Sequence, residues 1–382
     1  MRSVFALPAL VCATTVMFES PIRVRRFIFN VHLILAACAG AFVVTLAGTG
    51  SIIEFEPELD RAFHARLAYV RAGQDPLSLV EIGNAVSRRF GGEPVVAYFL
   101  AAKPDLSWQV ALPSGIAYVN QYTGEVLGER RRGETFLGLV RELHLRLGGG
   151  ELGGGILKWS TVAMLFSLVS GLYLWWPNKQ IRIRLMRSKR LRWSDLHHTV
   201  GIVSLLPLGL LATSGVILGF EGQLAPVVYR LTDSRPAVVS RFSASVHQTE
   251  AATITPDQAV AIARRLVPNA VAYRVQMPKY GGVYQVALSD ANDGVAGDRN
   301  IVALDPYGNV VSVVKSSTVS RGDRVFMVNE AIHTGNILGV PTRIGALLGT
   351  IAALVQVSSG LAMWMYRRKI VGTSAVPLEA TQ

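Results

Sequence analysis

The stretch FIFNVHLILAACAGAFVVTLAGTGSII, residues 27–53, decides the fold of this chain. It contains no charged side chain, and a helix of this length can cross about 30 Å of hydrocarbon. Further long apolar runs cover residues 155–176, 196–220 and 343–366. We therefore predict an α-helical membrane protein with a four-span bundle.

The composition supports a membrane location. Half of the 382 residues are apolar, 17% are charged, and the mean hydropathy is +0.35, whereas soluble domains carry about 25% charged residues. The formal net charge is +12, but the basic residues cluster beside the apolar runs. The expected partner is therefore the lipid bilayer, and no nucleic acid is expected. Both cysteines lie in apolar stretches, so no disulfide is expected in the polar loops.

The predicted orientation rests on lysines and arginines in the short flanks of the spans. They concentrate in three segments on one side of a four-span chain, residues 1–26, 177–195 and 367–382. That side is expected to be cytoplasmic, so both termini lie inside and the long loops, 54–154 and 221–342, lie outside. Residues 1–20 contain a signal-like apolar core without an Ala-x-Ala site, and their fate stays open.

Each long loop is predicted to be a small α+β module. Helical periodicity over 77–90 precedes strand-like stretches in the first loop. In the second loop, Thr255 is expected to cap a helix over 257–266, and strands follow again. The predicted strands are 95–100, 108–112 and 117–120 in the first module, and 272–277, 283–288 and 301–304 in the second.

The chain contains an internal duplication. Three segments have counterparts 165 positions later. His32 corresponds to His197, Thr49-Gly50 to Ser214-Gly215, and Phe55-Glu56 to Phe220-Glu221. After 189 positions, His144 and Ser170-Gly171 recur as His333 and Ser359-Gly360. The chain is thus two copies of one unit: span, outer module, span. Four of the seven histidines follow this repeat, whereas His64, His198 and His247 do not.

Two histidines at one depth on facing helices can supply both axial imidazoles of a six-coordinate haem. We expect His32 and His197 near the inner face, and His144 and His333 near the outer face. A lone intramembrane histidine can equally be a packing or proton-relay residue. Zinc or copper would require further ligands that the spans lack. The expected partners of the haem propionates are Arg141, Arg146 and Arg343 outside, and Arg26 and Arg192 inside.

Several of these segments resemble the PepSY-associated transmembrane helix family. They are His32 followed by small residues, Trp193-Ser-Asp-Leu-His197-His-Thr-Val-Gly201, Leu143-His144 and Ile332-His333-Thr-Gly335. The resemblance covers about residues 20–370. The outer modules resemble PepSY domains, and within the family the chain resembles the FoxB-type ferric-siderophore reductases of the bacterial inner membrane.

The resemblance implies a multi-pass protein of the inner (cytoplasmic) membrane with periplasmic PepSY-like modules. It also implies two haem b groups per chain, an inner one on His32 and His197 and an outer one on His144 and His333. The family usually has Arg or Lys where this chain has His198. His198 therefore remains an alternative ligand, although the repeat favours His197.

The implied function is that of an oxidoreductase that passes electrons from the cytoplasmic side to a periplasmic ferric siderophore and releases Fe(II). No Rossmann or flavin fingerprint is present, so a cytoplasmic flavoprotein or a membrane quinol is the expected donor. The alternatives are a cytochrome b-like carrier to another periplasmic acceptor and a non-enzymatic PepSY anchor or binding protein. A siderophore permease is disfavoured because no broken span is predicted.

No catalytic residue is assigned from the sequence. The acceptor is expected between the two outer modules, beside the outer haem. Aromatic candidates for contacting it, most of them expected to be core residues instead, are Trp108, Tyr118, Tyr122, Tyr273, Tyr280 and Tyr284.

Overall fold

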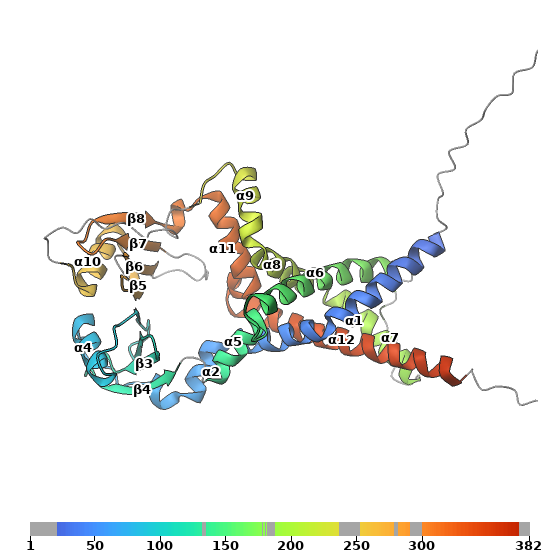
Figure 1. The fold of residues 1–382 in the computed structure, drawn as a ribbon, viewed down its shortest axis with the longest axis horizontal. Coiled ribbons are helices and arrows are strands. Elements are labelled where there is room, and N and C mark those ends of the chain that lie inside the picture. The colour runs from blue at the N-terminus through green and yellow to red at the C-terminus, as the bar shows by residue number, and fades with distance from the viewer. Residues whose placement is uncertain are drawn as a thin grey trace, which may run out of the picture.

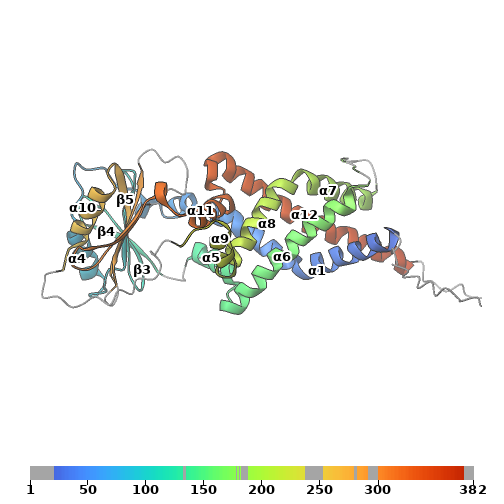
Figure 2. The same cartoon turned by 90° about the horizontal axis from the view of Figure 1, so that it is seen from above.

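The computed structural model describes residues 21–131, 135–177, 179, 181, 188–236, 253–278, 282–290 and 300–373. A helical bundle lies at one end of the molecule and a β-sheet at the other, with short helices between them (Figures 1 and 2). We call the two ends of the bundle sheet-proximal and sheet-distal. The predictions for residues 1–20, for part of the basic loop and for the tail from 374 lie outside the described residues.

Three helices of the bundle are long and apolar enough to cross a membrane: α1 (Pro21–Ile53), α6 (Gly150–Trp175) and α12 (Val340–Thr373). Helices α7 (Lys189–Val203) and α8 (Leu205–Gly219) meet the same test only as a pair, and they are bent by 66°. Large apolar side chains are exposed on the bundle surface, among them Phe166 (60%) and Leu206 (73%). Such a surface is expected where lipid covers the protein.

The expectation of an unbroken third span is wrong, because the helix breaks at Ser204. Pro207 lies in the first turn of α8, where its missing N–H is tolerated. In one continuous helix the proline ring would clash with the carbonyl of Val203. The matching residue of the first copy is Phe42, and α1 runs unbroken there. A missing helix break therefore no longer argues against a permease.

The segments between the membrane helices form one eight-stranded antiparallel sheet with the order β4-β3-β2-β1-β5-β6-β7-β8. The two predicted modules are thus halves of a single sheet, joined where β1 pairs with β5 and Tyr98 lies opposite Val275. The edge strands β4 and β8 were not expected from the sequence pattern. The strands are β1 (Ala97–Phe99), β2 (Trp108–Ala111), β3 (Gly115–Val119), β4 (Val126–Arg131), β5 (Ala270–Gln276), β6 (Tyr284–Asp290), β7 (Asn300–Leu304) and β8 (Val310–Val314).

Two helices cover one face of this sheet, on the side away from the bundle (Figures 1 and 2). They are α4 (Leu79–Arg89) and α10 (Pro256–Leu266). Beneath them one row of side chains crosses both halves, and each of its members is at most 3% exposed. The row consists of Ala117, Val110, Tyr98, Val275, Val286 and Val302. The core of the sheet is therefore continuous across the junction of the two copies.

Short helices connect the sheet to the bundle. The Asp60 carboxylate in α2 accepts a hydrogen bond from Tyr118 Oη at 2.7 Å and pairs with Arg130 at 2.6 Å, which fixes α2 against β3 and β4. Burial, and then the hydrogen bond to Asp60, raise the pKa of Tyr118, so its phenol remains a donor. The connecting helices are α2 (Glu56–Phe63), α3 (Ala65–Ala68), α5 (Phe136–Arg146), α9 (Glu221–Leu231) and α11 (Arg321–His333), with 3-10 turns η2 (Ser316–Thr318) and η3 (Asn336–Leu338).

Helix caps help to join the two halves of the sheet. Ser78 and Thr255 cap α4 and α10 through capping boxes, which confirms the predicted cap at Thr255. Asp257 in α10 also reaches across to the first half. Its carboxylate accepts hydrogen bonds from the backbone N–H groups of Leu79 at 2.8 Å and Val80 at 3.1 Å. These two backbone N–H groups lie in the first turn of α4, where they have no hydrogen-bond partner within the helix. A negative charge at the N-terminus of a helix is also favourable.

Replacing Asp257 with alanine is therefore expected to destabilise the sheet. Loss of a side chain that caps a helix costs about 1 kcal/mol, and this cap also joins two halves of the chain. Thermal unfolding in detergent, followed by far-UV circular dichroism, measures the change. The exposed Asp75, replaced with alanine, is the matched control because it makes no ion pair among the described residues. Equal midpoints for the two variants would contradict a joining role for Asp257.

Candidate cofactor site

His32 and His197 face each other at the sheet-distal end of the bundle. His32 lies on α1 and His197 on α7, and their ring centroids are 6.5 Å apart with the planes at 88°. Two imidazoles on one metal ion, with bonds of about 2 Å, have centroids roughly 6 Å apart. Both rings line one pocket together with Gly171, Gly201 and Gln356. The structure thus brings the predicted sheet-distal pair together.

His144 and His333 lie at the sheet-proximal end, on α5 and α11. Burial is the main cause that lowers the pKa of His144 to about 4, and the nearby His333 lowers it further. Burial also lowers the pKa of His333. Both imidazoles are therefore neutral near pH 7, which is the form that binds metals.

All four repeat-matched histidines make the same hydrogen bond. In each case Nδ1 lies 2.9–3.0 Å from the hydroxyl oxygen of a serine or threonine on a neighbouring helix. The pairs are His32 with Ser170, His144 with Thr49, His197 with Ser359, and His333 with Ser214. Each copy of the duplicated unit thus orients its own two histidines. The facing rings of His32 and His197 come from different copies, and so do His144 and the nearby His333.

The hydrogen bonds of the hydroxyl groups indicate which ring nitrogen carries the proton. Each hydroxyl lies 2.6–2.8 Å from the carbonyl oxygen four residues earlier in its own helix and donates its single proton there. Towards the histidine the hydroxyl oxygen is therefore an acceptor, and Nδ1–H donates to it. The lone pair of each neutral imidazole is then on Nε2. Such a hydrogen bond to the second ring nitrogen is the usual support of a metal-binding histidine.

A glycine follows each of the four hydroxyl residues and leaves space for the ring. A Cβ atom built on these glycines would lie 3.2–3.4 Å from the histidine Cε1, so a side chain there would push the imidazole away. The contacts are Gly50 with His144, Gly171 with His32, Gly215 with His333, and Gly360 with His197. The dipeptide of a hydroxyl residue and glycine is thus a seat for one imidazole.

The histidines outside the repeat have different surroundings. His198 lies beside His197, with ring centroids 6.1 Å apart, and it lines the sheet-distal pocket. His64 Nδ1 lies 3.1 Å from an Asp60 carboxylate oxygen at the base of the sheet. His247 lies outside the described residues.

The donor set fits haem better than an isolated metal ion. Nowhere in the described part of the chain do three histidine, cysteine, aspartate or glutamate side chains gather in a way that could hold a metal. Zinc sites need three or four protein ligands, whereas haem iron needs only one or two axial ligands from the protein. The two histidine pairs match that requirement.

The sheet-proximal arginines are partly engaged elsewhere. Arg343 pairs with Glu58 at 2.8 Å and with Glu54 at 3.3 Å, and Arg141 pairs with Glu56. The Arg343 guanidinium, as a hydrogen-bond donor, is the main cause that lowers the pKa of Glu58. Arg141 and Arg343 thus already hold carboxylates of the chain. Arg146 remains the sheet-proximal candidate for a propionate partner.

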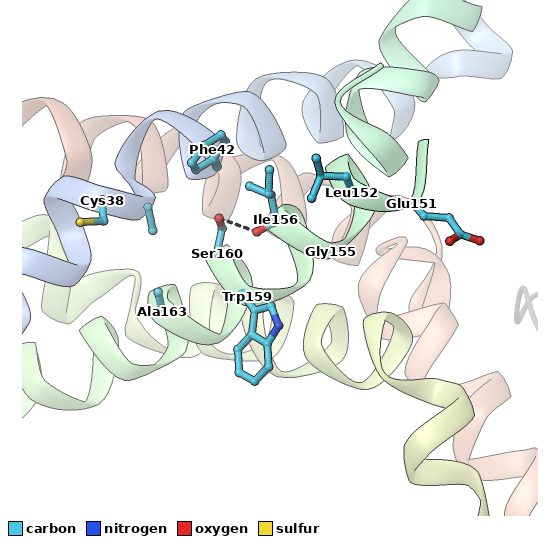
Figure 3. A pocket seen from close by; sticks show the side chains of 10 residues that line it. Cys38, Phe42, Glu151, Leu152, Gly155, Ile156, Trp159, Ser160 and Ala163 are labelled. Atoms are coloured by element: carbon cyan, nitrogen blue, oxygen red, sulfur yellow. Dashed lines mark hydrogen bonds between the residues drawn. The ribbon is translucent and has the colours of Figure 1, made fainter. Parts of the chain in front are cut away.

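A second pocket lies between α1 and α6 (Figure 3). Phe42 and Cys38 line it from α1, and Leu152 and Trp159 from α6, with Trp159 66% exposed. None of the four repeat-matched histidines lines this pocket. Its apolar, outward-open lining suits lipid acyl chains, and no catalytic role is assigned to it.

Together these features define a class of protein: a multi-pass membrane protein whose bundle carries two histidine pairs and is joined to an antiparallel sheet. A comparison with protein families finds a match to the PepSY-associated TM region over residues 29–367. The chain therefore belongs to this family, as its histidine segments predicted. No match to a curated protein was found.

Proposed function

We propose that this chain is an inner-membrane oxidoreductase with two haem b groups. It passes electrons from the cytoplasmic side to a ferric siderophore in the periplasm and releases iron as Fe(II). The observation that carries this proposal is the hydrogen bond at Nδ1 of all four paired histidines. It leaves the Nε2 atom of each ring available to bind haem iron. Haem held by these pairs supplies reversible one-electron transfer.

The proposed orientation places the sheet on the periplasmic side. Arg23, Arg25 and Arg26 lie at the sheet-distal start of α1, and Arg367 lies at the sheet-distal end of α12. Basic residues beside membrane spans favour the cytoplasmic side. The donor, a flavoprotein or a quinol, supplies the electrons, and one electron converts each bound Fe(III) to Fe(II). Hard oxygen chelators hold Fe(II) far less tightly, so reduction releases the metal.

The test begins with the colour of the purified protein in detergent. We expect a Soret band that shifts on dithionite reduction, a sharp α band and about two haems per chain. Anaerobic mixing of the reduced protein with ferric siderophores and an Fe(II) chelator should reoxidise the haem and trap Fe(II). A colourless protein after expression with ample haem would overturn the proposal and favour a PepSY anchor. Full haem content without reoxidation by any siderophore would point to another periplasmic acceptor.

A further inference from the structure

The sheet has a second face, opposite α4 and α10, that is turned towards the bundle and towards α5 and α11, the helices that contain His144 and His333 (Figures 1 and 2). Strand register places Gln109, Phe99 and Arg274 next to one another in a row across β2, β1 and β5. In the adjacent row, Gln276 lies opposite Gln285. We call these five residues the arginine face. It spans the junction of the two halves of the sheet.

Strand alternation shows that these side chains point away from α4 and α10. Val110, Tyr98 and Val275 belong to the buried core row under those helices. Each of these three is the immediate chain neighbour of a member of the arginine face, and successive side chains of a strand point to opposite faces. Phe99 is 37% exposed, so the arginine face has accessible apolar surface beside its polar groups.

Arg274 carries an unsatisfied hydrogen-bond donor on this face. Its Nε atom is buried and makes no hydrogen bond. Among the described residues of β1, β2, β5 and β6, register places no other charged side chain on this face, and further along it, at β3 and β4, Arg130 is paired with Asp60 of α2. The Ser312 hydroxyl, in the row of Gln276 and Gln285, is also buried without a hydrogen bond. Buried donors in native proteins are almost always satisfied, so an unsatisfied guanidinium N–H points to a missing acceptor.

We propose that the arginine face binds the electron acceptor, and that this acceptor is an anionic Fe(III) chelate with oxygen donors. This inference rests on the proposed function and names the substrate class. The planar guanidinium of Arg274 donates to carboxylate, hydroxamate or catecholate oxygens, for which its fork geometry is suited. The glutamine amides add neutral hydrogen bonds, and Phe99 contacts the organic part of the ligand. The chelate then lies on the side of the sheet that faces α5 and α11, the helices that contain His144 and His333.

Binding can be tested apart from electron transfer with gallium(III) citrate, an anionic complex that does not undergo this reduction. Isothermal titration calorimetry of the purified full chain is expected to show binding. Arg274→Gln should weaken it at least about tenfold, because hydrogen bonds to charged groups are among the stronger ones. Arg274→Lys keeps the charge without the fork and should give an intermediate affinity. Hexaamminecobalt(III), a cation, should show no dependence on residue 274.

Arg264→Gln is the matched control, because Arg264 is an exposed arginine of α10 on the opposite side of the sheet. It should bind gallium citrate as the unmodified chain does. Unchanged binding in Arg274→Gln, equal weakening in Arg264→Gln, or no binding by the unmodified chain would each overturn the arginine face. A haem-free chain that still binds gallium citrate through Arg274 would overturn the proposed function and leave the arginine face standing.

Discussion

Replacing His144 with alanine is expected to empty the sheet-proximal site and to leave the sheet-distal site filled. His144 and His333 supply the two imidazoles of one pair, and the other pair lies at the opposite end of the bundle. The haem content should therefore fall from about two to about one per chain, since a six-coordinate haem needs both axial ligands. A pyridine haemochrome assay on the purified protein measures this. His333→Ala should give the same loss.

The control for this experiment is His64→Ala. His64 bonds Asp60 at the base of the sheet and lies in neither pair, so both haems should remain. A protein that keeps two haems after His144→Ala would contradict the assignment of the sheet-proximal pair. Combining His144→Ala with His333→Ala should remove no more haem than either change alone, because both act on the same site.

Much of the bundle could be predicted from the sequence. Runs such as residues 27–53 are too long and too apolar for anything but a membrane helix or a deeply buried one. The break after Val203 was harder to foresee, because a proline within an apolar run is tolerated in membrane helices. Pro207 marks the place in the sequence. Only the structure shows that it starts a new helix at 66° to the old one.

The single sheet could not be predicted from local pattern. The pairing of β1 with β5 joins residues such as Tyr98 and Val275, which are far apart in the chain and carry no local turn signal between them. Edge strands also give a weak strand signal in the sequence, because polar and charged residues are favoured at the edge of a sheet. Strand β4 ends in Glu129, Arg130 and Arg131, which hide its strand character.

The pairing of the histidines could be predicted from the repeat, but the hydroxyl residues that form hydrogen bonds with them could not. Thr49-Gly50 and Ser170-Gly171, like their equivalents in the second copy, were recognised only as markers of the duplication. Their chemical meaning depends on which helix packs against which, and spacing along the chain does not reveal that. The usable signal was present, because a hydroxyl residue before glycine recurs at all four matched positions. Such a dipeptide within a span predicts a seat for a ring from a neighbouring helix.

The geometry also separates His197 from its neighbour His198. His197 has the features shared by the other three paired histidines: its Nδ1 lies 3.0 Å from Ser359 Oγ, and its ring packs on Gly360. Its ring also faces His32 at 6.5 Å. His198 has no counterpart in the repeat and lacks such a seat among the described residues.

Replacing His197 with alanine is accordingly expected to remove the sheet-distal haem, whereas His198→Ala should retain both. The two variants differ by one position in the same helix, so each controls for the general effect of losing an imidazole from α7. Haem content should fall from about two to about one per chain only in His197→Ala. The opposite result, with one haem lost in His198→Ala and both kept in His197→Ala, would show that the ring seated on Gly360 is not a ligand. The hydroxyl–glycine seat would then be a packing motif, and the case for haem at the other three histidines would lose its main support.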